Sequence, residues 1–310
     1  GSPLGPLSLS LEPFLGFADL EPEATLSLTR ETLRRKVVLD AYRRLTPVSR
    51  RGRHLGIGNS LAALLWGRDD GEYFMATGAG LTLTPPSADR EWWRLRLYAE
   101  RHADVDNHSD FALVHAFEDG WAFRPSIEAS EHDEVGAEVL LSPWWGTDPL
   151  APQAGIELYG QAARGYGGAD DYARASLLLR GAVPFRILGW DLRAALEVEG
   201  GRSWGDLPPQ REWYLGSVST LRGYDASTLH GPAFARARAE LARAFPVTSV
   251  ALFTDAGWAG PDPDAFRYDA GLLSVGVGAS ILDGLVRLDL SRGLQEPRDT
   301  RVDLYLDAAF

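Results

Sequence analysis

Alternation of apolar and polar residues recurs along most of the chain and limits its fold more than any other sequence feature. Apolar residues occupy every second position in 95–100, 156–161, 286–291 and 302–307, and Arg, Glu, Asp, Tyr or Ser fill most positions between them. Side chains two residues apart in a β-strand point to the same face of the sheet. Each segment therefore predicts a strand with one apolar face and one strongly polar face.

Read in this way, the chain divides into sixteen expected strands. They lie near 7–16, 33–44, 55–66, 72–83, 91–101, 109–118, 121–131, 135–145, 153–164, 171–181, 186–199, 233–244, 247–258, 270–281, 284–293 and 302–310. Connections after even-numbered strands are mostly tight, and those after odd-numbered strands are often longer and acidic. An even strand number, with short turns at one rim and long loops at the other, is typical of bacterial outer-membrane barrels.

Composition and charge exclude several other classes of protein. The formal net charge is −12 and the chain has no cysteine. An acidic balance argues against nucleic-acid binding, which needs clustered Lys and Arg. The absence of cysteine excludes disulfides, zinc–thiolate sites and cysteine nucleophiles. The longest uncharged stretch around the most apolar segment is 54–67, too short for a membrane-spanning helix, which needs about 20 apolar residues.

A soluble sandwich or propeller is the alternative fold, because a half-buried soluble strand also alternates. Two observations favour a barrel in a membrane. About sixteen strands enclose a lumen too wide for side chains to fill, so charged faces suit a wet interior. Tryptophans also gather near expected strand ends, where an interfacial girdle would lie. They are Trp92, Trp93, Trp144, Trp145 and Trp258.

The long segment 200–232 carries the most specific motif. Residues 216–224 read Gly-Ser-Val-Ser-Thr-Leu-Arg-Gly-Tyr and fall between expected strands eleven and twelve. Glu240 follows on the next strand, and Phe253-Thr-Asp-Ala-Gly257 follows on the one after it. Over about 211–310 this order resembles the barrel domain of the outer-membrane assembly and translocation superfamily that includes BamA, TamA and FhaC, also described as the bacterial surface antigen family.

The resemblance implies that the tip of this loop folds into the lumen and is locked there. Its locking residues would be Leu221, Arg222, Gly223, Tyr224, Glu240, Phe253, Asp255 and Gly257. Strand parity places Glu240 and Asp255 on lumen faces of neighbouring strands, so the Arg222 fork can bridge both carboxylates. Gly223 permits close approach or a positive φ, and Tyr224 can pack inside with its hydroxyl bonded.

The last strand resembles the signal by which outer-membrane proteins are recognised for assembly. Phe310 ends the chain, and Val302, Leu304 and Leu306 occupy alternate positions before it. The glycine that is common within this signal is absent here. Residues 1–310 are expected to form a single barrel domain, with 1–6 as linker or cloning residues and no room for a POTRA domain.

The resemblance implies a protein of the bacterial outer membrane that inserts other outer-membrane proteins or exports a partner. Its expected partners are membrane lipids, client outer-membrane or secreted proteins, and a POTRA-containing segment or chaperones. Nucleic acid is not expected to bind. The mechanism needs no cofactor and no catalytic residue. The segment from His102 to His108 could hold a divalent cation, but its place in a polar loop predicts no metal site. A passive anchor or pore is the alternative function, and an enzyme is the third.

Overall fold

A computed structural model describes residues 7–15, 21–52, 54–105, 111–118, 120–148, 150–266, 270–281 and 285–306. Seventeen strands are present in this part of the chain, and fifteen of them form one antiparallel sheet. The sheet contains β1 (Leu7–Leu15), β2 (Pro22–Glu31), β3 (Lys36–Pro47), β4 (Tyr73–Thr84), β5 (Trp93–Ala103), β6 (His132–Leu141), β7 (Trp144–Trp145), β8 (Gln153–Tyr166), β9 (Tyr172–Ile187), β10 (Trp190–Gly205), β13 (Ala233–Ala244), β14 (Thr248–Gly260), β15 (Leu272–Ile281), β16 (Val286–Gly293) and β17 (Thr300–Leu306). The expected all-β antiparallel barrel of about sixteen strands is confirmed.

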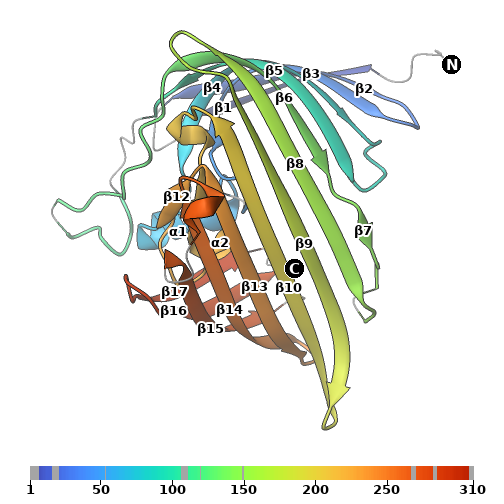
Figure 1. The fold of residues 1–310 in the computed structure, drawn as a ribbon, viewed down its shortest axis with the longest axis vertical. Coiled ribbons are helices and arrows are strands. Elements are labelled where there is room, and N and C mark those ends of the chain that lie inside the picture. The colour runs from blue at the N-terminus through green and yellow to red at the C-terminus, as the bar shows by residue number, and fades with distance from the viewer. Residues whose placement is uncertain are drawn as a thin grey trace.

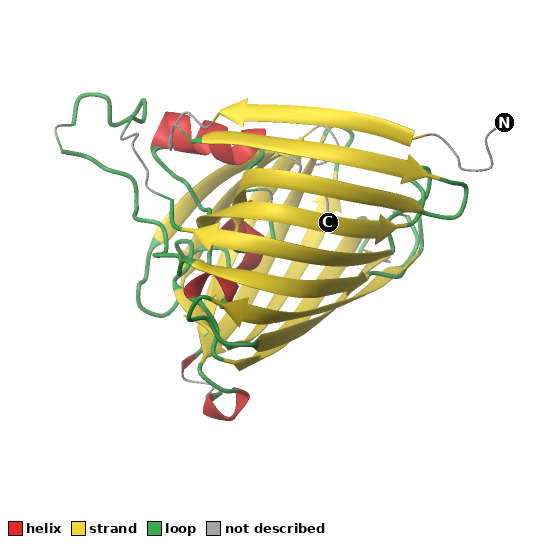
Figure 2. Cartoon of the chain, turned by 90° about the horizontal axis from the view of Figure 1, so that it is seen from above, coloured by secondary structure: helices red, strands yellow, loops and turns green. Residues whose placement is uncertain are grey.

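The strands curve around an interior that holds short helical segments (Figure 2). Each strand pairs with its neighbour along the chain, and β10 pairs with β13 across the longest connection. Within the described residues β1 pairs with β2 alone and β17 with β16 alone. No described main-chain bond therefore joins the first strand to the last.

The described strands place polar side chains on the inside and apolar side chains on the outside, which is the reverse of a soluble protein. On β14, Leu252 on the outward face is 58% exposed, whereas Asp255 on the inward face is 0% exposed. Many other Arg, Glu and Asp side chains are buried on the inside, while leucines and valines of the strands are half exposed. This is the pattern of a barrel with an apolar outer band and a polar lumen. No helix in the described part of the chain is long and apolar enough to cross a membrane.

Several expected strands are placed differently by the structure. The segment 55–66 was expected to be a strand, but Ile57–Trp66 forms helix α1. Its apolar residues Leu61, Leu64 and Leu65 follow helical spacing, and Gly67 ends the helix with φ 67°. The strand β2 was missed, because Leu26 and Leu28 give only a short alternation among Ser and Thr.

The strands expected at 109–118 and 121–131 do not form in the described residues: 111–118 and 121–131 are loop, while 109–110 lie outside the described residues. Pro125 interrupts the second segment. The main-chain N of Ile127 donates to the Glu72 carboxylate at 2.9 Å rather than to a neighbouring strand, and the Ser126 hydroxyl donates to the same carboxylate at 3.1 Å. Five long strands follow the long loop, as expected.

The connection between β10 and β13, residues 206–232, is shorter than the expected 200–232 because β10 continues through Gly205. It contains η1 (Pro209–Arg211), β11 (Trp213–Leu215), α2 (Ser217–Thr220) and β12 (Leu229–Gly231), and a second short 3-10 helix, η2 (Pro263–Ala265), follows β14. Helix α1 lies beside β17 (Figure 1), and residues of α1, α2 and β17 line one common cavity. Leu215, Leu221 and Tyr224 of this loop are buried, so loop 206–232 packs against the inner wall.

Candidate functional site

Arg222 is the centre of the site. Its Nε and Nη2 donate to the two carboxylate oxygens of Asp255 at 2.8 and 2.7 Å, and its main-chain N donates to Oδ2 at 3.0 Å. Both side chains are 0% exposed. A bidentate guanidinium–carboxylate pair combines two charge-assisted hydrogen bonds with a fixed relative orientation of the two side chains. The structure therefore joins the loop tip to β14 at one carboxylate.

Two further carboxylates and one ring surround the same guanidinium. Arg222 Nη1 lies 3.2 Å from Glu240 Oε2 on β13 and 3.5 Å from Asp289 Oδ2 on β16. Its Cζ lies 3.6 Å from the centre of the Phe253 ring, which is the geometry of a cation–π contact. Burial alone would lower the pKa of Arg222, but the hydrogen bonds and charge of Asp255 raise that pKa above its ordinary value. The guanidinium therefore stays charged.

A closed turn aims Arg222 at the wall. Gly216 takes φ 144° before the single turn of α2. The Thr220 hydroxyl donates to Gly216 O at 2.6 Å and accepts from Gly216 N at 2.8 Å. Ser217 N also donates to Tyr224 O at 2.9 Å, which closes the segment 217–224 on itself. Residues on either side of Arg222 are thus hydrogen-bonded to each other within the loop itself, independently of the barrel wall.

The other motif residues fit the loop tip to the wall. Leu221 is 0% exposed and packs beside Gly257, where an added Cβ would lie 3.2 Å from Leu221 Cδ2. Gly223 has φ 84°, and a Cβ there would lie 3.0 Å from the Cβ of Ser274. The Tyr224 hydroxyl donates to Leu273 O at 2.8 Å. Small residues at Gly223 and Gly257 therefore allow the backbone and Leu221 to approach the strands closely.

Three residues of the same cluster were not predicted as members of the site. Arg287 donates to Glu240 at 3.0 and 2.7 Å and to Asp289 at 2.8 Å, and Tyr305 donates to Asp289 at 2.6 Å. The alternation in 286–291 and 302–307 placed these side chains on one polar face. It could not show that the loop tip reaches as far as β16 and β17.

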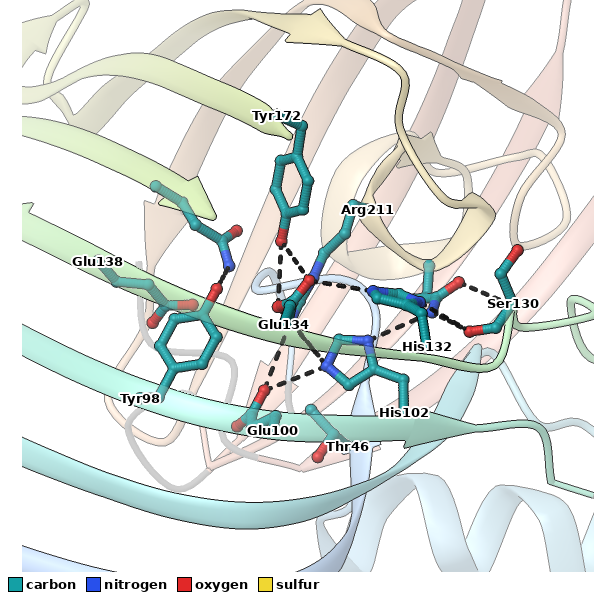
Figure 3. Close-up of polar contacts among 12 residues, drawn as sticks. Thr46, Tyr98, Glu100, His102, Ser130, His132, Glu134, Glu138, Tyr172 and Arg211 are labelled. Atoms are coloured by element: carbon teal, nitrogen blue, oxygen red, sulfur yellow. Dashed lines mark hydrogen bonds and ion pairs between the residues drawn. The ribbon is translucent and has the colours of Figure 1, made fainter. Parts of the chain in front are cut away.

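The other end of loop 206–232 is held by a separate group of polar contacts, which Figure 3 shows. Arg211 Nη2 lies 2.6 Å from Glu134 Oε1, and Gln210 exchanges two hydrogen bonds with the main chain of Ser130 at 3.0 and 2.8 Å. The Tyr172 hydroxyl also donates to Glu134, at 3.0 Å. This group, here called the Arg211 cluster, joins the loop to β6 and β9. Sequence reasoning missed it.

The Arg211 cluster contains a set of atoms with metal-ligand spacing. Ligand atoms of His102, His132 and Glu134 lie within 4.8 Å of one another. However, Arg211 Nη2 already donates to the Glu134 carboxylate, and the same Nη2 lies 3.1 Å from His102 Nε2. The two ring nitrogens of His132 lie 3.0 Å from Ser130 O and 3.1 Å from Glu134, so both face acceptors. These contacts fit a loop anchor better than a cation site.

The segment from His102 to His108, which the sequence offered as a possible cation site, is described only in part. Its His102 belongs to the Arg211 cluster, and Asp104 Oδ1 accepts from Ala129 N at 3.0 Å. Asp106 and His108 lie outside the described residues. The two described positions, His102 and Asp104, have different partners.

The residues of the expected C-terminal signal lie on β17 as far as they are described. Val302 and Leu304 point outward and are 56% and 42% exposed. Leu306 ends the strand, and Phe310 lies outside the described residues. Val302 and Leu304 thus form an outward apolar row on β17, and the assembly signal itself stays a prediction.

Comparison with known proteins connects this architecture to solved barrels. No protein-family model matches the sequence, and no curated protein matches it. CdiB from Acinetobacter baumannii superimposes with a TM-score of 0.56 at 17% identity, covering 97% of this chain and 53% of that chain. BamA from Haemophilus ducreyi lacking POTRA domains 1–3 gives a TM-score of 0.62 at 14% identity, covering 98% and 64%.

The chain thus spans between half and two thirds of the length of each of these structures. At such low identity the likeness concerns the fold. It extends over nearly all of this chain, including the strands on both sides of loop 206–232. The chain therefore has a barrel of the BamA and CdiB type.

Proposed function

We propose that this chain is an outer-membrane barrel that assists the insertion of outer-membrane proteins or the translocation of a partner protein. The observation that carries the proposal is the buried Arg222–Asp255 pair, which fixes the loop tip on the inner wall. The order of its parts, with Arg222 in the loop, Glu240 on β13 and Asp255 on β14, is the order of the family motif. The fold likeness to BamA and CdiB supports it. Residues of the motif would act by locking the loop, without covalent chemistry.

The mechanism that we propose uses strand pairing at the seam between β1 and β17. An unpaired strand edge offers a row of main-chain donors and acceptors to any extended segment. A client strand would add to such an edge while the loop keeps the lumen closed beneath it. The partners would be membrane lipids and client proteins, with a POTRA-containing segment or chaperones delivering the client. The site of action would be the bacterial outer membrane.

The test is reconstitution of the chain in liposomes, followed by addition of an unfolded outer-membrane barrel as client. Folding of the client is measured by its heat-modifiable mobility on gels. The proposal predicts faster client folding than in liposomes containing a porin-type barrel at equal density. Equal rates in both liposomes would instead favour a passive anchor, and a large steady conductance would favour a pore.

A further inference from the structure

The outer edge of β17 carries main-chain groups that face away from β16. Gly293 N donates to Asp299 O at 3.0 Å, which places residue 299 in a hydrogen-bonded pair. Hydrogen-bonded and non-hydrogen-bonded pairs alternate along an antiparallel ladder. Val302, which pairs with Leu290, therefore directs its N–H and C=O away from β16, toward the edge where another strand would add.

Arg68 occupies that edge. Its Nη1 donates to Val302 O at 2.7 Å and to Asp303 Oδ1 at 2.7 Å. One guanidinium thus holds an edge acceptor and the adjacent inward-facing carboxylate together. A strand that paired with β17 at this position would need the same carbonyl for its own N–H.

The end of α1 fixes the position of Arg68. Gly67 takes a left-handed conformation, its N donates to Ala63 O at 2.9 Å, and Arg68 N donates to Ala62 O at 3.3 Å. A Cβ at Gly67 would lie 2.3 Å from Trp121 Cζ2. The helix end is therefore closed by its own carbonyls and packed against Trp121, so Arg68 is presented from a rigid support.

The same segment is tied both to β17 and to the start of β4. Asp70 Oδ1 lies 3.3 Å from Arg301 Nη2 on β17. On the other side, Asp69 Oδ1 accepts from Asn59 Nδ2 at 2.8 Å and from the Tyr73 hydroxyl at 3.0 Å, where β4 begins. Residues 57–70 thus connect the β4 side of the barrel to the last strand through side chains.

A cavity of about 910 Å³ lies beside this contact. Ile57 and Trp66 of α1, Val218 of α2, and Val302 and Leu304 of β17 contribute to its lining. The sequence of α1 contains no charged residue, and none of its residues is buried. An apolar surface is therefore present beside the β17 edge, where the apolar face of an added strand would lie.

We propose that α1 and Arg68 form a cap on the β17 edge, which must leave Val302 before a client strand pairs there. This inference rests on the proposed function and specifies its regulation. The partner that displaces the cap would be an extended segment with alternating apolar residues, whose N–H would replace the Arg68 donor at Val302 O. Arg68 would thus be a positioning residue that sets how easily the edge opens.

The test measures strand binding to the folded chain in detergent micelles. The probe is a dye-labelled synthetic peptide with the sequence of residues 300–310, TRVDLYLDAAF, and binding is followed by fluorescence anisotropy. A net hydrogen-bond contribution predicts that Arg68→Ala binds the peptide roughly two- to tenfold more tightly than the parent chain. Arg68→Lys, which keeps a cationic donor, should restore most of the competition.

The matched control is Arg202→Ala, because Arg202 pairs with Asp262 at 3.0 Å with both side chains exposed. It should bind the peptide like the parent chain. A benzophenone side chain at position 304 should cross-link to the peptide, which assigns binding to the β17 edge. If Arg68→Ala does not fold, Arg68→Gln, whose side chain is too short to make both contacts, takes its place.

Equal affinity of the parent chain and Arg68→Ala, or tighter binding without a cross-link at 304, would overturn the cap. Client folding in liposomes is scored separately. If the parent chain accelerates client folding but Arg68 has no effect on peptide binding, only the cap is wrong. If peptide binding follows Arg68 but no variant accelerates client folding, the cap stands and the proposed function fails.

Discussion

Arg222 and Asp255 are joined by three hydrogen bonds inside the barrel, although 33 residues separate them in the chain. One residue lies at the tip of loop 206–232 and the other on the inward face of β14. Neither side chain contacts solvent. Their pairing makes the position of the loop tip depend on one guanidinium, and this dependence can be tested.

Replacing Arg222 by alanine is expected to release the loop tip. Asp255 would lose the two guanidinium bonds, keep at most the bond from the main-chain N of residue 222, and remain as a buried charge with weaker compensation. Breaking a buried ion pair in this way costs about 3–5 kcal/mol of unfolding free energy. The measurement is the temperature at which the folded band disappears in heat-modifiability gels, together with protease cleavage within loop 206–232. Arg202→Ala, which breaks an exposed pair, should cost about 1 kcal/mol or less; an equal loss in both variants would contradict a special role for Arg222.

Gly223→Ala should destabilise the loop more than Gly167→Ala. Both glycines have positive φ, 84° and 74°, so both substitutions carry a similar backbone cost of about 1 kcal/mol. At Gly223 the new Cβ would also crowd Ser274 at 3.0 Å, whereas nothing lies within 4 Å of a Cβ at Gly167. The difference in melting temperature between the two variants isolates the close approach of the tip to the wall, and no difference would argue against it.

Arg211→Ala should free the first part of the loop while its tip stays bound. The substitution removes the 2.6 Å contact with Glu134 but leaves the Arg222–Asp255 pair intact. Limited proteolysis is expected to cut within 206–215 and to spare 217–224. Arg101→Ala is the matched control, because Arg101 joins β5 to β6 through an exposed pair with Asp133 at 2.7 Å. New cleavage of the tip in Arg211→Ala would show that the two attachments are not independent.

Combining Arg211→Ala with Arg222→Ala should open the lumen. The parent chain is expected to give small, unsteady conductance in planar bilayers, because loop 206–232 packs on the inner wall at both ends. Each single variant keeps one attachment, so a steady increase in conductance should need both substitutions. A parent chain with the same steady conductance as the double variant would contradict a closed lumen.

Strand parity accounts for what the sequence could predict. Alternation in 286–291 and 302–307 was enough to separate an outward apolar row from an inward polar one, since the period of a strand is fixed by its geometry. The same parity put Glu240 and Asp255 on the inside, within reach of Arg222. The number of strands after the loop followed from the same reasoning.

Other features depend on contacts that leave no local pattern. Helix α1 was expected to be a strand because a short apolar run does not distinguish the two, and its caps are two glycines. The contact between Arg211 and Glu134 joins residues 77 positions apart, and nothing near either one indicates the other. The hydrogen bond from Arg68 to the carbonyl of Val302 could not be predicted either, because a main-chain acceptor has no sequence signature.

The central claim is that the loop locked by Arg222 is needed for handling client proteins, and client folding in liposomes tests it most directly. Parent chain, Arg222→Ala and Arg202→Ala are compared at equal density, after gels show that each is folded. The account predicts that the parent chain and Arg202→Ala accelerate client folding equally, and that Arg222→Ala loses most of this acceleration. Full acceleration by Arg222→Ala, with its loop cleaved by protease in the same samples, would contradict the account.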